Sequence, residues 1–209
     1  MEKDVSYALN LEKYPESYKK FLKEEQEKLI PLLEKEYSVL DVGCGNGRMI
    51  SIIAPKVKRY LGIDIDKKVI EEVKEKSKNF NNSEIINLNA EKLTSKFKDN
   101  SFDLVVCLWN TVACVKDDKK LFGEIYRVTK KLFFLSAIKK GTLEERKKYY
   151  NSLGINYSID KNESINSDTW GRVKAYSEKE ITSLAKDVGF KILEIGDLAN
   201  LSYYLILEK

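Results

Sequence analysis

The 209-residue chain is long enough to bury the core of one α/β domain, and it contains no histidine, which excludes a histidine base, nucleophile or metal ligand. Its net charge of +4 is too mild to indicate a nucleic-acid binder, and its three cysteines have neither metal-type spacing nor a disulfide pattern. No stretch approaches the roughly eighteen apolar residues of a membrane span and the start lacks a signal-peptide pattern, so we expect a cytoplasmic protein with no membrane partner and no metal.

Residues 1–36 precede the first predicted strand and are rich in Tyr, Lys and Glu. Large apolar residues recur there at helical spacing, which predicts an amphipathic helix from about Pro15 to Glu34. Pro15 suits the first turn of such a helix, and Pro31 is expected to kink or end it.

A strand, a glycine turn and a helix are predicted next. Ser38 to Val42 is a short apolar run typical of a strand, and glycines follow at positions 43, 45 and 47. Apolar residues from Met49 to Ile53 then return to helical spacing. Glycines permit a sharp turn and a close approach of the backbone to a ligand, so this turn is the first candidate for a binding site.

Two acids are predicted at the tips of neighbouring parallel strands. Asp41 precedes the glycine turn, where it would repel a diphosphate but suit a ligand with positive charge. Arg59 to Asp64 reads as a second buried strand, and Asp64 follows the turn by about twenty residues. A carboxylate at that tip can accept both hydroxyls of a ribose; the alternative is a helix N-cap, a role that Asp66 could also fill.

The pattern Asp41-x-Gly43-x-Gly45-x-Gly47 with Asp64 resembles motif I and the second strand of class I S-adenosylmethionine-dependent methyltransferases. The resemblance implies an α/β, three-layer, Rossmann-like fold with a seven-stranded, mostly parallel sheet and an antiparallel last strand. It also implies S-adenosyl-L-methionine as cofactor and S-adenosyl-L-homocysteine as product. The cofactor-binding residues that it implies are Asp41, Gly43, Cys44, Gly45, Asp64, Ile65, Asn89, Ala90, Glu91 and Leu108.

The third strand departs from the family pattern at its tip. A helix is predicted from Asp66 to Asn79 and a strand from Glu84 to Leu88. The family has an acid and then a small residue after this strand, and the pair reads the adenine edge; this chain has Asn89 and Ala90. An asparagine can still bond to adenine. Glu91 could substitute for it, unless Glu91 is simply exposed to solvent.

The fourth strand, from Ser101 to Trp109, is continuously apolar between Leu104 and Leu108, as expected for a strand covered on both faces. Open α/β sheets bind ligands at this end of their strands. We therefore expect the Leu108 backbone to touch the cofactor, and Trp109 and Asn110 to face the methyl group or acceptor. The alternative for Trp109 is that it only caps the core.

A helix over 117–129 and a fifth strand over 131–138 precede an insertion, residues 139–175, that breaks the α/β rhythm. We read this insertion as a cap on the acceptor side, with Trp170, Arg172 and Tyr176 lining the acceptor pocket. The alternative is a partly mobile hairpin that its aromatic residues only anchor. A helix over 178–188 and strands over 190–195 and 202–207 complete the expected sheet.

The leading segment 1–36 is expected to form a helical lid near the cofactor, as in many relatives. Tyr7, Tyr14 and Tyr18 are candidates for its active-site face, although aromatic residues at this spacing more often serve packing. The whole chain, 1–209, is thus expected to be a single methyltransferase domain, either a monomer or a homodimer.

The expected reaction is in-line transfer of the sulfonium methyl group to a small-molecule amine or hydroxyl, largely by positioning. No catalytic acid or base can be named; the acceptor-side candidates are Trp109, Asn110, Trp170, Arg172 and Tyr14. One alternative is an RNA methyltransferase that uses Lys139, Lys140 and residues 146–148 as a phosphate patch. This patch alternates with acids, so nucleic acid is the less favoured partner. Another alternative is a non-catalytic sensor or partner subunit that binds the cofactor.

Overall fold

The computed structural model describes residues 10–209. Tyr7, a candidate for the lid, lies outside the described residues. A seven-stranded sheet runs through the molecule in the order β3-β2-β1-β4-β5-β10-β9. β10 runs antiparallel to both β5 and β9, and the pairs among β1 to β5 are parallel, so the expected fold class is confirmed. The strands of this sheet are β1 (Ser38–Val42), β2 (Arg59–Asp64), β3 (Ser83–Asn87), β4 (Phe102–Cys107), β5 (Thr129–Ile138), β9 (Lys191–Leu198) and β10 (Ser202–Glu208).

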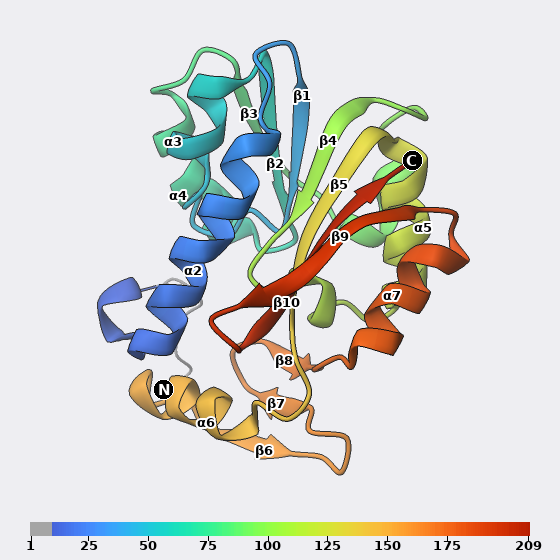
Figure 1. Ribbon diagram of the computed structural model, residues 1–209. Helices are drawn as coiled ribbons and strands as arrows, with labels where there is room; N and C mark the ends of the chain where they lie inside the picture. Colours follow the sequence, from blue (N-terminus) through green and yellow to red (C-terminus); the bar gives the residue numbers. More distant parts are fainter. Residues whose placement is uncertain (1–9) are drawn as a thin grey trace.

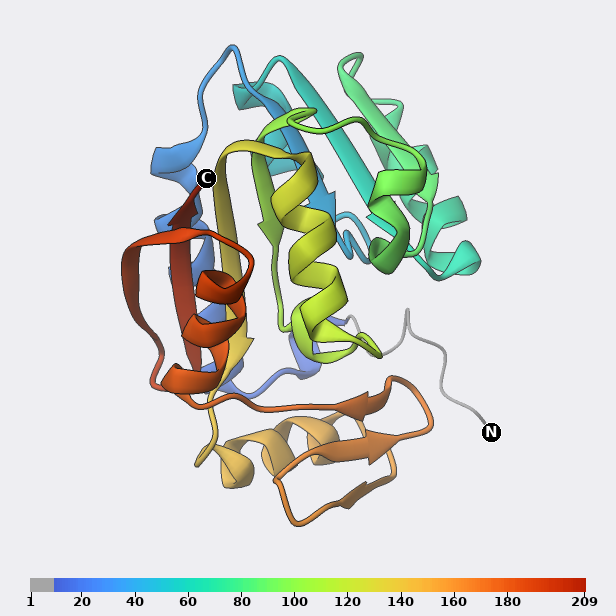
Figure 2. The same cartoon turned by 90° about the vertical axis from the view of Figure 1, so that its right-hand side faces the viewer.

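Helices cover both faces of this sheet (Figures 1 and 2). One face packs against α2 (Glu16–Leu29), α3 (Ile50–Ile53) and α4 (Lys67–Ser77). The other face packs against the 3-10 helix η4 (Ala90–Ser95), α5 (Asp118–Val128) and α7 (Glu178–Asp187). The remaining 3-10 helices are η1 (Leu11–Lys13), η2 (Ile30–Leu32), η3 (Ala54–Lys56) and η5 (Thr111–Ala113). Among the described residues, no helix is both long and apolar enough to cross a membrane.

The first predicted helix is shorter than expected, the helix after the glycine turn is very short, and a proline explains both. The first ends at Leu29, and Pro31 lies in the 3-10 turn η2 that follows. The helix after the glycine turn has only four residues before Pro55 converts it to η3. Proline lacks the N–H that a continuing α-helix would require, so each segment tightens into a 3-10 turn.

The insertion over 139–175 folds into α6 (Leu143–Ser152) and a small antiparallel sheet of β6 (Tyr157–Ile159), β7 (Ile165–Ser167) and β8 (Gly171–Val173). We call this segment the cap. Both views show it gathered at one end of the large sheet, with the start of α2 beside α6 (Figures 1 and 2). Ser17 of α2 donates a hydrogen bond to Glu145 of α6 at 2.7 Å, so the leading helix and the cap are in contact.

Gly43 has φ of +75°, and a Cβ atom there would lie 2.4 Å from Cγ2 of Thr111. We expect Gly43→Ala to lower the free energy of unfolding by about 2 kcal/mol, because both the backbone conformation and the contact oppose a side chain. Gly123 lies inside α5 with open space around it, so Gly123→Ala should instead stabilise the protein by about 0.5–1 kcal/mol. Urea unfolding of both variants measures the difference, and equal effects would contradict this account.

Candidate active site

The glycine turn is tied to the tip of β2 by Asp64. Gly43, Gly45 and Gly47 all have positive φ, as a sharp left-handed path requires. One carboxylate oxygen of Asp64 accepts from the Gly45 amide at 3.0 Å, and the other accepts from the Asp66 amide at 3.0 Å. Asp66, not Asp64, caps α4, so the alternative role for Asp64 is taken by its neighbour. Each Asp64 oxygen keeps a lone pair for a further donor.

Asp41 is enclosed by protein rather than open to a ligand. Its side chain is 2% exposed and accepts from the Tyr60 hydroxyl at 2.7 Å. Burial raises the pKa of Asp41 to about 6, although the Tyr60 hydrogen bond and the Arg48 charge oppose the rise. The Asp41 carboxylate is therefore not available for direct contact with a molecule over the turn.

The tips of β2 and β3 meet beside the turn. The Leu88 amide donates to the Asp64 carbonyl at 3.0 Å, which aligns the two tips. Ile65 is 68% exposed at this edge, an unusual exposure for a large apolar side chain. Asn89 caps η4 by accepting from the Glu91 amide, and Ala90 begins that 3-10 helix. The Glu91 carboxylate accepts from the Asp117 amide at 2.8 Å, so it anchors the chain before α5 instead of only facing solvent.

A buried ion pair that the sequence patterns did not reveal joins α2 to the glycine turn. The Glu25 side chain is fully buried, and its carboxylate lies 2.6 Å from Nη2 of Arg48. The other carboxylate oxygen of Glu25 accepts from the Trp109 amide at 2.9 Å and from the Ser136 hydroxyl. Nη1 of Arg48 is buried and has no hydrogen-bond partner among the described residues. The helical spacing of residues 15–34 does not tell which partner Glu25 meets, so the sequence did not single it out.

The loop after β4 turns sharply. Trp109 and Asn110 have φ of 53° and 60°, which is uncommon for residues other than glycine. The Trp109 amide is held by Glu25 and Ser136, and the side-chain oxygen of Asn110 accepts from the Ile138 amide at 3.0 Å. The Leu108 carbonyl accepts from both the amide and the hydroxyl of Thr111. These bonds fix the direction in which Trp109 leaves the sheet.

Beside this loop lies a cavity of about 70 Å³, which we call the acceptor cavity. Its walls come from α2, the loop after β4, the end of β5 and the cap, and they are largely aromatic. The lining residues are Tyr18, Trp109, Asn110, Cys114, Ile138, Arg146, Tyr149, Tyr150, Trp170 and Val173.

Aromatic stacking connects the leading segment to the cap. Tyr14 is stacked on Trp109 with ring centroids 5.3 Å apart, and Tyr18 is stacked on Tyr149 at 4.4 Å. Trp170 in turn stacks on Tyr149 at 5.8 Å. Tyr14 and Tyr18 are each 4% exposed, so they pack into the structure, as the more common role of such residues suggests.

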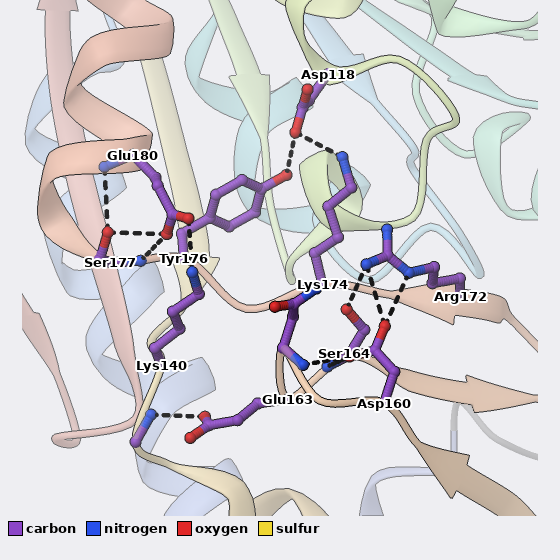
Figure 3. Close-up of polar contacts among 12 residues, drawn as sticks. Asp118, Lys140, Asp160, Glu163, Ser164, Arg172, Lys174, Tyr176, Ser177 and Glu180 are labelled. Atoms are coloured by element: carbon purple, nitrogen blue, oxygen red, sulfur yellow. Dashed lines mark hydrogen bonds and ion pairs between the residues drawn. The ribbon is translucent and has the colours of Figure 1, made fainter.

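Arg172 and Tyr176 do not line the acceptor cavity. Arg172 donates to Asp160 and to Ser164 within the cap sheet, and the Tyr176 hydroxyl donates to Asp118 at 3.1 Å (Figure 3). Both residues line a separate polar groove of about 560 Å³ between the cap and α7. Of the acceptor-side candidates, the structure thus brings together Tyr14, Trp109, Asn110 and Trp170 and leaves Arg172 outside.

The basic residues considered as a phosphate patch already have partners. Lys139 pairs with Asp197 and Lys140 with Glu180 (Figure 3). The lysines at 147 and 148 pair with the acids three residues earlier in α6. Arg146 is 2% exposed and lines the acceptor cavity, so it is not a surface residue at all. In the sequence it looked like its lysine neighbours, because the charge pattern of 144–148 does not distinguish the buried position.

One protein-family model matches part of the chain. Residues 40–134 match the family model described as methyltransferase domain. No curated protein matches the chain significantly in sequence.

Solved structures share the fold over nearly the whole chain. The chain is similar to a SAM-dependent methyltransferase from Aquifex aeolicus, with 19% identity and a TM-score of 0.69 over 99% of this chain and 98% of that one. A protein from Pyrococcus horikoshii OT3 has 22% identity and a TM-score of 0.74, with 97% and 98% covered. The 1,6-didemethyltoxoflavin-N1-methyltransferase from Burkholderia thailandensis has 14% identity and a TM-score of 0.68, with 90% and 78% covered. At these identities the likeness establishes the shared Rossmann-like fold.

The buried ion pair predicts a large effect of one neutral substitution. Glu25→Gln should lower the free energy of unfolding by about 3–5 kcal/mol, because Arg48 keeps its charge and loses its counter-ion. Glu27→Gln on the same helix removes an exposed acid whose ion pair with Lys23 is long, at 3.8 Å, and should change stability by less than about 0.5 kcal/mol. Chemical unfolding of both variants tests this, and a small loss in Glu25→Gln would refute it.

The raised pKa of the buried Asp41 carboxyl predicts that the stability of the protein depends on pH. Its pKa in the folded protein is raised to about 6 from 3.8, so the folded state holds the proton more tightly than the unfolded state between these values. This group should therefore cost stability as the pH rises from about 4 to 6, by roughly 3 kcal/mol in total. Asp41→Asn should lack this loss, and its stability relative to the parent should grow over that window. Unfolding curves at pH 4.5 and 7.5 provide the measurement; a constant difference would argue against a raised pKa.

Proposed function

We propose that the chain transfers the methyl group of S-adenosylmethionine to a small-molecule acceptor held in the acceptor cavity. The match of residues 40–134 to a methyltransferase-domain model and the Rossmann-like fold support this proposal. The observation that carries the proposal is the position of this cavity. It lies against Trp109, directly beyond the tip of β4, and the glycine turn lies at the adjacent tip of β1. A cofactor over the turn would thus be next to the cavity.

The residues around the turn suit the cofactor. Asp64 has free lone pairs at the strand tip for the two ribose hydroxyls, and the exposed Ile65 beside it offers an apolar surface for the adenine. Asn89 and Ala90 border that surface, and Glu91 holds the adjoining segment in place. These are the assignments that we propose for the nucleoside half.

The methionine half would lie over the glycines, beside the Arg48 guanidinium. Nη1 of Arg48 is a buried donor with no partner among residues 10–209, which makes it a suitable partner for a carboxylate. The buried charge of Asp41 favours a cation nearby. Gly43, Cys44, Gly45 and the Leu108 backbone would line this part of the site.

When bound, S-adenosylmethionine supplies a methyl group whose bond to sulfur breaks as an acceptor lone pair forms the new bond, which leaves S-adenosylhomocysteine. The protein's contribution is to hold the acceptor in line with the methyl–sulfur bond and to exclude water from the cavity. Tyr14, Tyr18 and the cap cover the acceptor cavity, and Trp109 is fixed by Glu25 and Ser136. Orientation of this kind can supply up to roughly 7–11 kcal/mol of the barrier reduction.

A small molecule is a better acceptor than RNA for this site. The acceptor cavity is small and aromatic, and the basic residues considered as a phosphate patch, Lys139, Lys140 and 146–148, are paired or buried. Radiolabelled S-adenosylmethionine, incubated with the protein and with cell extract divided into RNA and small-molecule fractions, should label the small-molecule fraction. Label in RNA would overturn this choice of acceptor, and no label in either fraction would favour a non-catalytic binding protein.

The cofactor assignment predicts the effect of one substitution at the tip of β2. Asp64→Asn should weaken S-adenosylhomocysteine binding by roughly 10- to 100-fold, because a hydrogen bond to a charged group contributes about 1.5–3 kcal/mol. Asp66→Asn is the matched control, since asparagine is also a good N-cap for α4 and should leave binding unchanged. Isothermal titration calorimetry measures both. Equal binding by the two variants, or no binding by the parent protein, would count against the assignment.

A further inference from the structure

The acceptor cavity contains one cation that lacks a counter-ion. Arg146 on α6 is 2% exposed and lines the cavity. Its guanidinium donates to two backbone carbonyls of the cap, those of Glu163 and Val173. No ion pair within residues 10–209 includes Arg146. An arginine has five N–H donors, so two carbonyls do not exhaust it, and carbonyls do not neutralise its charge.

The acids closest to Arg146 are engaged elsewhere. Glu163 offers its backbone carbonyl to Arg146, but its carboxylate accepts from the Gly141 amide at 2.8 Å (Figure 3). Asp160 pairs with Arg172 at 3.2 Å on the outer side of the cap. The carboxylate that would normally accompany a buried arginine is therefore missing from the cavity wall, and an anion inside the cavity would supply it.

The cavity also lacks a base that could deprotonate an acceptor. Its lining residues include no carboxylate, and the chain has no histidine. Apart from Arg146, the titratable groups on the wall are the hydroxyls of Tyr18, Tyr149 and Tyr150 and the thiol of Cys114, and desolvation raises the pKa of each, so the thiol also stays protonated. These hydroxyls stay protonated at neutral pH and can donate hydrogen bonds. An acceptor must then arrive with its lone pair already free.

We propose that the acceptor is a small planar organic oxyanion, such as a carboxylate, a phenolate or an enolate, and that Arg146 is its counter-ion. This inference rests on the proposed function and narrows the acceptor to one chemical class. The rings of Trp109 and Trp170, with Tyr149 stacked on Trp170 and edge-on to Trp109, provide flat surfaces for a conjugated group. An oxyanion has no proton to lose when its oxygen takes the methyl group, so the missing base is not needed. A protonated amine would meet the fixed charge of Arg146 and would first have to lose a proton.

The two tryptophans of the chain report on this cavity directly, because both line it. Benzoate, benzamide and benzamidinium have nearly the same shape and carry a negative, a neutral and a positive group. With S-adenosylhomocysteine at saturation, benzoate should quench the tryptophan fluorescence at concentrations at least tenfold lower than benzamide. Benzamidinium should bind more weakly still.

Three variants test whether Arg146 causes the preference for benzoate over benzamide. Arg146→Gln should bring benzoate and benzamide to within about twofold of each other, while Arg146→Lys should keep part of the preference. Arg172→Gln is the matched control: it removes an arginine from the same cap, outside the cavity, and should keep the full preference. Circular dichroism melts show whether each variant is folded, and the parent protein with the three probes still decides if Arg146→Gln does not fold.

The outcomes separate this inference from the proposed function. If benzamide or benzamidinium binds as tightly as benzoate, or if benzoate does not bind at millimolar concentration, the oxyanion is refuted. If Arg172→Gln loses the preference as Arg146→Gln does, Arg146 is not the counter-ion. Calorimetry with S-adenosylhomocysteine is performed first on the same sample. Absence of cofactor binding there defeats the proposed function itself, whereas cofactor binding without an anion preference defeats only the inference.

Discussion

The carboxylate of Glu25 holds the site together. It receives the Arg48 guanidinium from the glycine turn, the amide of Trp109 from the loop after β4 and the hydroxyl of Ser136 from β5. Three segments that are distant in sequence thus meet one buried charge on the leading helix. A charge in that position is stable only while these donors surround it, so the position of α2 and the geometry of the site depend on each other.

The two halves of the proposed site, one for the cofactor and one for the acceptor, are built from different kinds of residues. The cofactor side consists of strand tips, glycines and acids, which the parallel sheet fixes in space. The acceptor side consists of aromatic rings from α2, the loop after β4 and the cap, with Arg146 among them. In the proposed function, the strand tips of the sheet would hold the cofactor, and the added helix and cap would select the acceptor. In the polar groove, the ion pair between Lys174 of the cap and Asp118 of α5 joins the cap to the rest of the domain (Figure 3).

Prediction succeeded where neighbours in sequence are also neighbours in space. The extent of β1, the sharp turn at Gly43 and the helix predicted over 178–188 each depend on local backbone preferences, and each is found in the structure. Prediction fell short at Arg146, which resembled its exposed lysine neighbours, and at Glu25, whose partners lie 23 to 111 residues away along the chain. Burial and distant pairing are properties of the packed molecule, so charge patterns and helical periods contain little information about them.

The sequence by itself determined the order of strands and helices, the glycine turn with its two acids, and the absence of any histidine for catalysis. These follow from residue types and short spacings, which act through local sterics and hydrogen bonding. Only the tertiary structure decided that Asp41 is enclosed, that Arg172 lies outside the acceptor cavity and that Arg146 lies inside it. The reason is that a side chain's solvent exposure and its partners are set by which surfaces pack together, and that packing involves the whole chain at once.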